Sequence, residues 1–249
     1  MKNDRYSSLL TKNHLGKQPE QQQDYLEAVK AIARLTYESL YIIDYADMSF
    51  EYVSDNPLFL CGYTAAEVLQ SGYDFYFRHV PEPDLELLNI INETGFNFFK
   101  TLPVAERKEL SITYDFHLIS KDGKPVLINH KLTPLLMTPD GNMWKALCIV
   151  SISHHQTAGH ARIYRQHSAD VWKLDVKQRR WRKSRKPALT ERETAVLRLH
   201  AQGLTISQIA EKLFVSPDTV KYYRRRIFER LEVNSIVEAL SYAINSRII

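Results

Sequence analysis

Residues 187–249 read PALTERETAVLRLHAQGLTISQIAEKLFVSPDTVKYYRRRIFERLEVNSIVEALSYAINSRII. Four helix starts are visible in this segment, at Thr190, Thr205, Ser216 and Ser235. The first two threonines are followed three residues later by Glu or Gln, the pattern of a capping box, in which side chains pair with the free amides of the first turn. Pro217 fits the first turn of the third helix because the amide it lacks would have no partner there. The segment therefore predicts an all-α unit of four short helices.

The connection between the second and third helices consists of Phe214 and Val215 alone. So short a link forces the two helices to cross sharply, which is the geometry of a helix-turn-helix, whose second helix lies in the DNA major groove. Apolar residues at helical spacing mark the buried side of that helix as Val220, Ile227 and Leu231. The opposite side is then cationic and faces solvent or DNA.

The outward side of this helix supplies the candidate site. We predict contacts to base edges from Lys221, Tyr222 and Arg225, because Lys and Arg are the commonest readers of guanine. We predict contacts to backbone phosphates from Ser216, Thr219 and Arg224, next to the free amides of the helix start. The alternative is that the cationic run is a solvated helix face.

Charge is divided unevenly along the chain. Residues 156–249 hold 19 Lys and Arg against 9 Asp and Glu, whereas residues 1–155 hold 14 against 20. Neutralisation of phosphates supplies most of the sequence-independent affinity for nucleic acid, so the basic part is suited to double-stranded DNA. A basic surface without a partner is the alternative.

The pattern LTERE, AQGLT, LFVSPDTVK and VEAL in residues 189–240 resembles the LuxR/GerE-type DNA-binding domain of bacterial transcription regulators. This resemblance implies a sequence-specific DNA-binding regulator. Tyr223 and Arg226 depart from the residues common in the family, which affects the target sequence more than the fold. The family's fourth helix often forms a dimer contact; packing within the same domain is the equal alternative for the residues in question, Ile236, Leu240, Tyr242 and Ala243.

The acidic part reads as an α+β domain. Residues 21–40 form an amphipathic pattern, and short strands are expected at Tyr41–Tyr45 and Phe50–Val53. A capping box at Thr64 opens a short helix, and residues 81–92 predict a longer one. The antiparallel part of the sheet is then expected as three strands separated by turn signals, at Glu109–Ser120, Pro125–Leu136 and Met143–Ile152.

The stretches EYVSDNPLFLCGYTAAEVL and YDFYFRHVPEPD, together with the closing strands, resemble a PAS sensor domain over residues 40–154. PAS folds hold small ligands, haem or flavin, or hold nothing and serve as dimer modules. Cys61 does not lie in the loop that a flavin photosensor needs, and residues 81–92 contain no His for haem, so the cofactor stays unknown. His154, His155 and His160 have no carboxylate or thiol at ligand spacing, so no metal site is expected.

We divide the chain into a tail (1–24), a PAS-like sensing or dimerisation domain (25–155), a basic connector (156–186) and the helix-turn-helix domain (187–249). The connector shows alternation at Val171–Val176 and Arg179–Lys183 that suits a β-hairpin. Its basic run ends at the helix-turn-helix and either contacts phosphates or is a solvated linker; it comprises Arg179, Arg180, Arg182, Lys183, Arg185 and Lys186.

The sequence contains no Gly-rich phosphate loop, HExxH or GxSxG motif, so an enzyme is not expected. No apolar run is long enough for a membrane helix and the first residues lack the core of a signal peptide, which favours a cytoplasmic protein without a membrane partner. A homodimer on two DNA half-sites is expected, with RNA polymerase as an open further partner. Two alternatives remain, a PAS module that pairs without ligand and a sigma-like polymerase-associated module. A core filled by side chains would favour the first.

Overall fold

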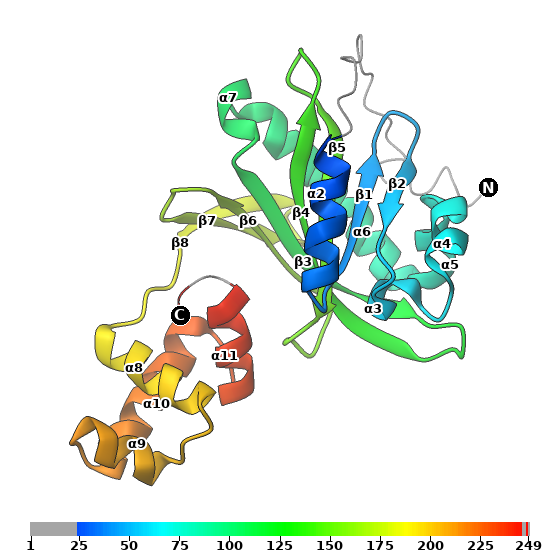
Figure 1. Ribbon diagram of the computed structural model, residues 1–249. Coiled ribbons are helices and arrows are strands. Elements are labelled where there is room, and N and C mark those ends of the chain that lie inside the picture. Colours follow the sequence, from blue (N-terminus) through cyan, green and yellow to red (C-terminus); the bar gives the residue numbers. More distant parts are fainter. Residues whose placement is uncertain (1–23, 246–247, 249) are drawn as a thin grey trace. The chain divides into compact units, whose positions relative to one another are not determined.

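The computed structural model describes residues 24–245 and 248 (Figure 1). The chain divides between Ser184 and Arg185 into two compact units, each of which is described by itself. The expected tail at 1–24 falls almost wholly outside the described residues. The bounds at 25–155, 156–186 and 187–249 stay a prediction.

The first unit is built on one eight-stranded sheet, in the order β2-β1-β5-β4-β3-β6-β7-β8. Its strands are β1 (Ser39–Asp44), β2 (Ser49–Val53), β3 (Leu110–Ile119), β4 (Pro125–Met137), β5 (Met143–Ile152), β6 (Gly159–Arg165), β7 (Asp170–Asp175) and β8 (Arg180–Arg185). The residue pairings from β1 through β7 are antiparallel. The α+β class expected of the acidic part is confirmed.

Helices cover both faces of this sheet (Figure 1). They are α2 (Asp24–Leu35), α3 (Pro57–Leu60), α4 (Ala65–Ser71), α5 (Asp74–His79), α6 (Glu82–Thr101) and α7 (Val104–Arg107). The main core lies between one face and α3 to α6, while α2 closes a smaller apolar cluster on the other face through Val29 and Ala33. Across the described residues, no helix combines the length and apolarity needed to span a bilayer.

A buried ionic group fastens α2 to its face of the sheet. Lys145 on β5 is 3% exposed, and its Nζ lies 2.8 Å from Glu51 Oε1 and 3.2 Å from the Tyr25 hydroxyl. The same hydroxyl donates to Glu51 at 2.7 Å. A buried charge is tolerated when it is paired and hydrogen-bonded, so these three side chains specify where α2 docks.

Several elements differ from the expected ones. The long helix continues past Asn92 to Thr101, and Pro103, which cannot continue a helix, follows its end. The strand pair expected in the connector is present as β7 and β8, but β6 was not expected. Because β6 pairs with β3, residues 159–185 extend the sheet by three strands.

The second unit consists of α8 (Glu191–Ala201), α9 (Ile206–Leu213), α10 (Pro217–Leu231) and α11 (Ile236–Asn245). Both expected capping boxes are formed, at Thr190 with Glu193 and at Thr205 with Gln208. Gly203 follows α8 with a φ of +81°, the left-handed conformation that glycine adopts without steric cost. The four-helix class is confirmed.

One apolar core holds the second unit together. Val196, Ile209, Val220 and Ile227 are all completely buried, so α8, α9 and α10 share it. Glu193 is 2% exposed; besides capping α8, its carboxylate lies 3.1 Å from Arg230 Nε on α10. The angle between α8 and α10 is therefore set by packing and by one ion pair.

Candidate nucleic-acid interface and sensor core

The third helix of the second unit, α10, presents two different sides. Val220 and Ile227 are 0% exposed and Leu231 is 1% exposed, as the spacing predicts. Lys221, Tyr222 and Arg225 are exposed on the opposite side. The structure thus brings together the three residues expected to contact base edges.

The cationic groups on this side are available to a ligand. Lys221 Nζ forms an ion pair with Asp218 at 3.0 Å, but both side chains are more than half exposed. Such surface pairs contribute little free energy, so the lysine can exchange Asp218 for DNA at small cost. Within the described residues, the Arg225 guanidinium forms no hydrogen bond or ion pair, whereas Arg226 is paired with Glu229 at 2.8 Å. Of the three consecutive arginines at 224–226, Arg225 therefore has the fewest existing contacts to lose when it binds DNA.

The start of α10 carries the hydroxyls expected to contact phosphate. Ser216 Oγ accepts the backbone N–H of Thr219 at 3.2 Å, and the two hydroxyl oxygens share a hydrogen bond at 2.9 Å. Two hydroxyls have two protons, and their mutual bond uses one of them. The other proton remains to be donated to a phosphate oxygen beside the positive end of the helix.

Arg224 lies beside this side of α10, with its guanidinium carbon 5.9 Å from the centre of the Phe228 ring. This contact holds the side chain along the helix without neutralising its charge. We expect Arg224→Ala to weaken binding to every duplex by a similar factor and to reduce the slope of log affinity against log salt by about one, because one phosphate contact is lost. Affinities measured at several salt concentrations check this.

A second arginine serves as control for that measurement. Arg192 is exposed on α8 and removing it changes the net charge equally. Arg192→Ala is expected to leave the salt slope near that of the wild type. Equal slopes for all three proteins would contradict the assignment of Arg224 to phosphate.

The fourth helix, α11, separates its apolar residues into two sets. Tyr242 is 4% exposed and Ala243 is 0% exposed, so both pack within their own unit. For these two candidate dimer residues the alternative of internal packing holds in the structure. Val237 and Ile244 are 71% and 62% exposed and, seven residues apart, lie on one side of the helix. Sequence reasoning missed them, because apolar residues on every side of a helix do not show which side is buried.

Aromatic rings fill the core of the first unit. Tyr41 and Phe59 stack with ring centres 4.1 Å apart, and Phe50, Phe75 and Tyr76 surround them at 5–7 Å. Tyr73, Phe75 and Tyr76 are all buried in this core. These rings therefore occupy much of the interior between the sheet and the helices.

Three hydrogen-bonded polar side chains lie among these rings. The Tyr41 hydroxyl shares hydrogen bonds with the Tyr76 hydroxyl and with His130 Nε2, the latter at 2.6 Å. His130 is completely buried, and its Nδ1 has no hydrogen-bond partner among the described residues. Burial disfavours the imidazolium, which lowers the pKa of His130 to about 3. The imidazole is therefore neutral at physiological pH.

This histidine makes the stability of the first unit depend on pH. Its pKa in the folded state, about 3, lies below the ordinary value of 6.5 that applies when the chain is unfolded. Between these values the unfolded chain takes up a proton that the folded chain does not. We therefore expect the free energy of unfolding to fall as the pH falls from 6.5, by up to about 1.4 kcal/mol per pH unit from this group, with no contribution above 6.5.

Chemical unfolding of the wild type and of His130→Gln at pH 7, 6 and 5 measures this contribution. The variant should lose less stability than the wild type over the same range. His154, whose pKa burial lowers to about 4, remains in both proteins and cancels in the comparison. Parallel pH profiles would show that His130 is protonated equally in the folded and unfolded chains.

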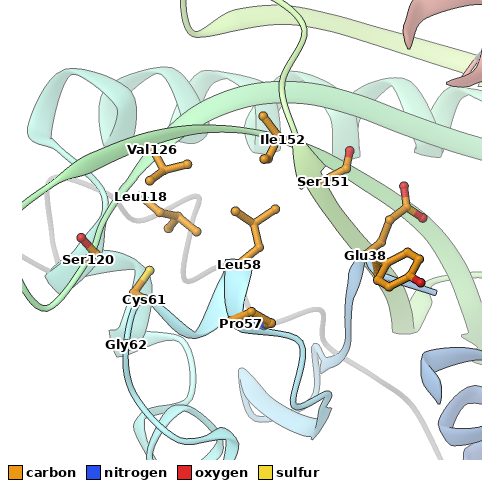
Figure 2. A pocket seen from close by; sticks show the side chains of 11 residues that line it. Glu38, Pro57, Leu58, Cys61, Gly62, Leu118, Ser120, Val126, Ser151 and Ile152 are labelled. Atoms are coloured by element: carbon orange, nitrogen blue, oxygen red, sulfur yellow. The ribbon is translucent and has the colours of Figure 1, made fainter. Parts of the chain in front are cut away.

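A pocket of about 590 Å³ lies at one end of the sheet, against α3 (Figure 2). Leu58 and Cys61 line it from α3 and the residue after it, and Leu118, Val126 and Ile152 line it from β3, β4 and β5. Burial raises the pKa of the Cys61 thiol to about 12, so this cysteine stays protonated and unreactive at neutral pH. The pocket is suited to an apolar group.

Residues 187–243 match the family described as bacterial regulatory proteins, luxR family. This stretch contains α8, α9, α10 and most of α11. The second unit therefore carries a luxR-family domain, which confirms the resemblance seen in the sequence.

Individual relatives agree with this assignment. NarL, the nitrate/nitrite response regulator protein of Escherichia coli, is 28% identical over 170 residues, 67% of this chain and 76% of NarL. The Fimbriae Z protein of Salmonella typhimurium is 42% identical over 55 residues, 22% of this chain and 26% of that protein. The chain thus spans about a quarter of the length of the Fimbriae Z protein.

Solved structures resemble the chain more weakly. The phage VqmA–DPO complex covers 90% of this chain and 88% of its own, with 17% identity and a TM-score of 0.35. A PAS domain from Colwellia psychrerythraea covers 52% of this chain and 98% of its own, with 16% identity and a TM-score of 0.38.

Proposed function

We propose that the chain is a sequence-specific DNA-binding transcription regulator. The observation that supports this most is the exposed, cationic side of α10, on a helix whose other side is completely buried in a luxR-family domain. In this proposal Lys221, Tyr222 and Arg225 contact base edges in the major groove, and Ser216, Thr219 and Arg224 contact phosphates. No catalytic role is assigned to any residue.

Selection of duplexes from a random pool by the full-length chain tests this function. Repeated rounds should enrich a common motif, and the enriched duplex should bind much more tightly than a scrambled one at the same salt concentration. Binding without added polymerase also distinguishes this function from that of a sigma-like polymerase-associated module. Recovery of unrelated sequences with equal, salt-dependent affinity would contradict sequence-specific recognition.

We infer that the regulator binds as a homodimer, with two α10 helices about one DNA turn apart. The exposed pair Val237 and Ile244 on α11 supports this inference, because two such patches can bury one another across a two-fold axis. Replacing Val237 by a charged residue places two like charges in that contact.

Val237→Glu is therefore expected to shift the full-length chain from dimer to monomer in sedimentation equilibrium. Because the position is 71% exposed, the fold should not change. Ala201→Glu, at an exposed position at the end of α8, adds the same charge as a control. If the Val237→Glu protein is as dimeric as this control, Val237 is not part of the dimer contact.

The first unit has two candidate roles. One is to sense a small ligand; the observation in its favour is the buried His130 Nδ1, which has no partner among the described residues, on a ring whose Nε2 shares a hydrogen bond with the Tyr41 hydroxyl. The other is to pair without ligand, and the aromatic filling of the core favours it. Native mass spectrometry of the purified full-length chain distinguishes the two. A bound small molecule supports sensing, and the bare chain mass together with no change on adding cell extract supports pairing alone.

A further inference from the structure

Three histidines and an aspartate that is distant from them in the sequence meet at the start of β6. His154 and His155 follow β5, and His160 is the second residue of β6. In the pairing of β3 with β6, Asp115 lies opposite Gly159. The fold thus places a carboxylate from the middle of β3 beside histidines about 40 residues later in the chain, a neighbourhood that sequence spacing does not show.

Asp115 is held in a fixed orientation. The residue is 0% exposed; its Oδ1 accepts a hydrogen bond from Asn129 Nδ2 at 2.9 Å, and its Oδ2 accepts one from His155 Nδ1 at 2.7 Å. Arg162 on β6 is close enough to interact electrostatically with the imidazoles. The carboxylate therefore has partners when no ion is bound, and the fold does not depend on one.

Two of the imidazoles stack face to face beside this carboxylate. The rings of His155 and His160 lie parallel, with centres 3.7 Å apart and an angle of 3° between their planes. One ligand atom from each of Asp115, His155 and His160 lies within 4.8 Å of the other two. Two imidazole nitrogens and one carboxylate oxygen are donors that suit zinc and neighbouring transition metals, whereas Mg²⁺ and Ca²⁺ prefer oxygen ligands throughout.

We propose that Asp115, His155 and His160 form a binding site for a divalent transition-metal ion, with Zn²⁺ as the first candidate. A tetrahedral ion with bonds of about 2.0–2.1 Å needs ligand atoms about 3.4 Å apart. His160 is exposed, so its side chain can rotate to close the distance, and His155 exchanges its proton on Nδ1 for the ion. The fourth position is left to water or to an exogenous ligand.

Further contacts position these ligands. The Asn129 amide orients Asp115, and the Thr157 hydroxyl lies 3.2 Å from His160 Nε2 before that side chain rotates toward the ion. Partners of this kind fix the orientation of metal ligands in proteins. Binding would tie the segment between β5 and β6 to the centre of the sheet, since Asp115 lies on β3, His155 lies within that segment and His160 lies directly after it on β6.

Cobalt absorption and zinc calorimetry on the untagged, full-length, chelator-treated chain test the site. We expect one Co²⁺ per chain with visible absorption bands that added Zn²⁺ abolishes. His155→Gln and His160→Gln should each weaken Zn²⁺ binding at least about tenfold. His167→Gln is the matched control, because this histidine is exposed on the turn after β6, outside the cluster.

Because His160 is exposed, His160→Gln is expected to fold, and it decides the question even if His155→Gln does not fold. A wild type without a saturable Co²⁺ spectrum would overturn the proposal. The same holds for a His160→Gln protein that binds Co²⁺ like the wild type, and for a His167→Gln protein that loses binding equally.

Discussion

The double variant Lys221→Ala/Arg225→Ala is expected to bind the selected duplex about 30-fold to 20,000-fold more weakly than the wild type. Each side chain that reads a base edge contributes about 1–3 kcal/mol, and each 1.4 kcal/mol is a factor of ten in affinity. Both residues are exposed, so the fold should remain intact. Binding isotherms at one fixed salt concentration measure the effect, with far-UV circular dichroism as the check on folding.

The control for this prediction removes the same charge from another helix. Arg192 and Arg198 are exposed on α8, and the double alanine variant of these two leaves α10 unchanged. Because neither arginine is assigned to a base edge or a phosphate, this variant should lose little affinity at that salt concentration. If the two double variants bind the selected duplex equally weakly, charge alone explains the binding and α10 has no special role.

The second large effect is on stability. Phe59→Ala should lower the free energy of unfolding of the first unit by about 3–5 kcal/mol, because it leaves a cavity in a core from which water is excluded. Phe59 is 0% exposed and stacks on Tyr41 with a ring separation of 4.1 Å. The second unit should be unaffected, since its apolar core is a separate cluster.

Tryptophan fluorescence measures this loss of stability. The chain's three tryptophans, Trp144, Trp172 and Trp181, all lie in the first unit, so their fluorescence follows the unfolding of that unit. Phe214→Ala is the control: Phe214 is 96% exposed, and its loss should change stability by less than about 0.5 kcal/mol. A second unit destabilised as much as the first by Phe59→Ala would mean that the two unfold as one.

The second unit could be predicted almost completely from the sequence. Each of its first three helices begins at a Ser or Thr cap that the structure confirms, and the buried positions of α10 follow from spacing alone. Local signals suffice there because the connections are short. What spacing could not show was which side of α11 is buried, since that depends on where α8 and α10 pack against it.

Less of the first unit can be predicted from the sequence. Strands β3, β4 and β5 have turn signals between them and were predicted, whereas β6 is defined by its pairing with β3, about fifty residues earlier. The same long-range pairing brings Asp115 to His155. The hydrogen bonds among Tyr41, Tyr76 and His130 likewise join elements far apart in the chain, so no local sequence pattern predicts them.

The most direct test of the central proposal is a second selection of duplexes, carried out with Arg225→Ala under the conditions used for the wild type. If the outer side of α10 reads base edges, the preference should relax at one base pair in each half-site while the other positions keep theirs. A motif indistinguishable from that of the wild type at every position would contradict this role for α10.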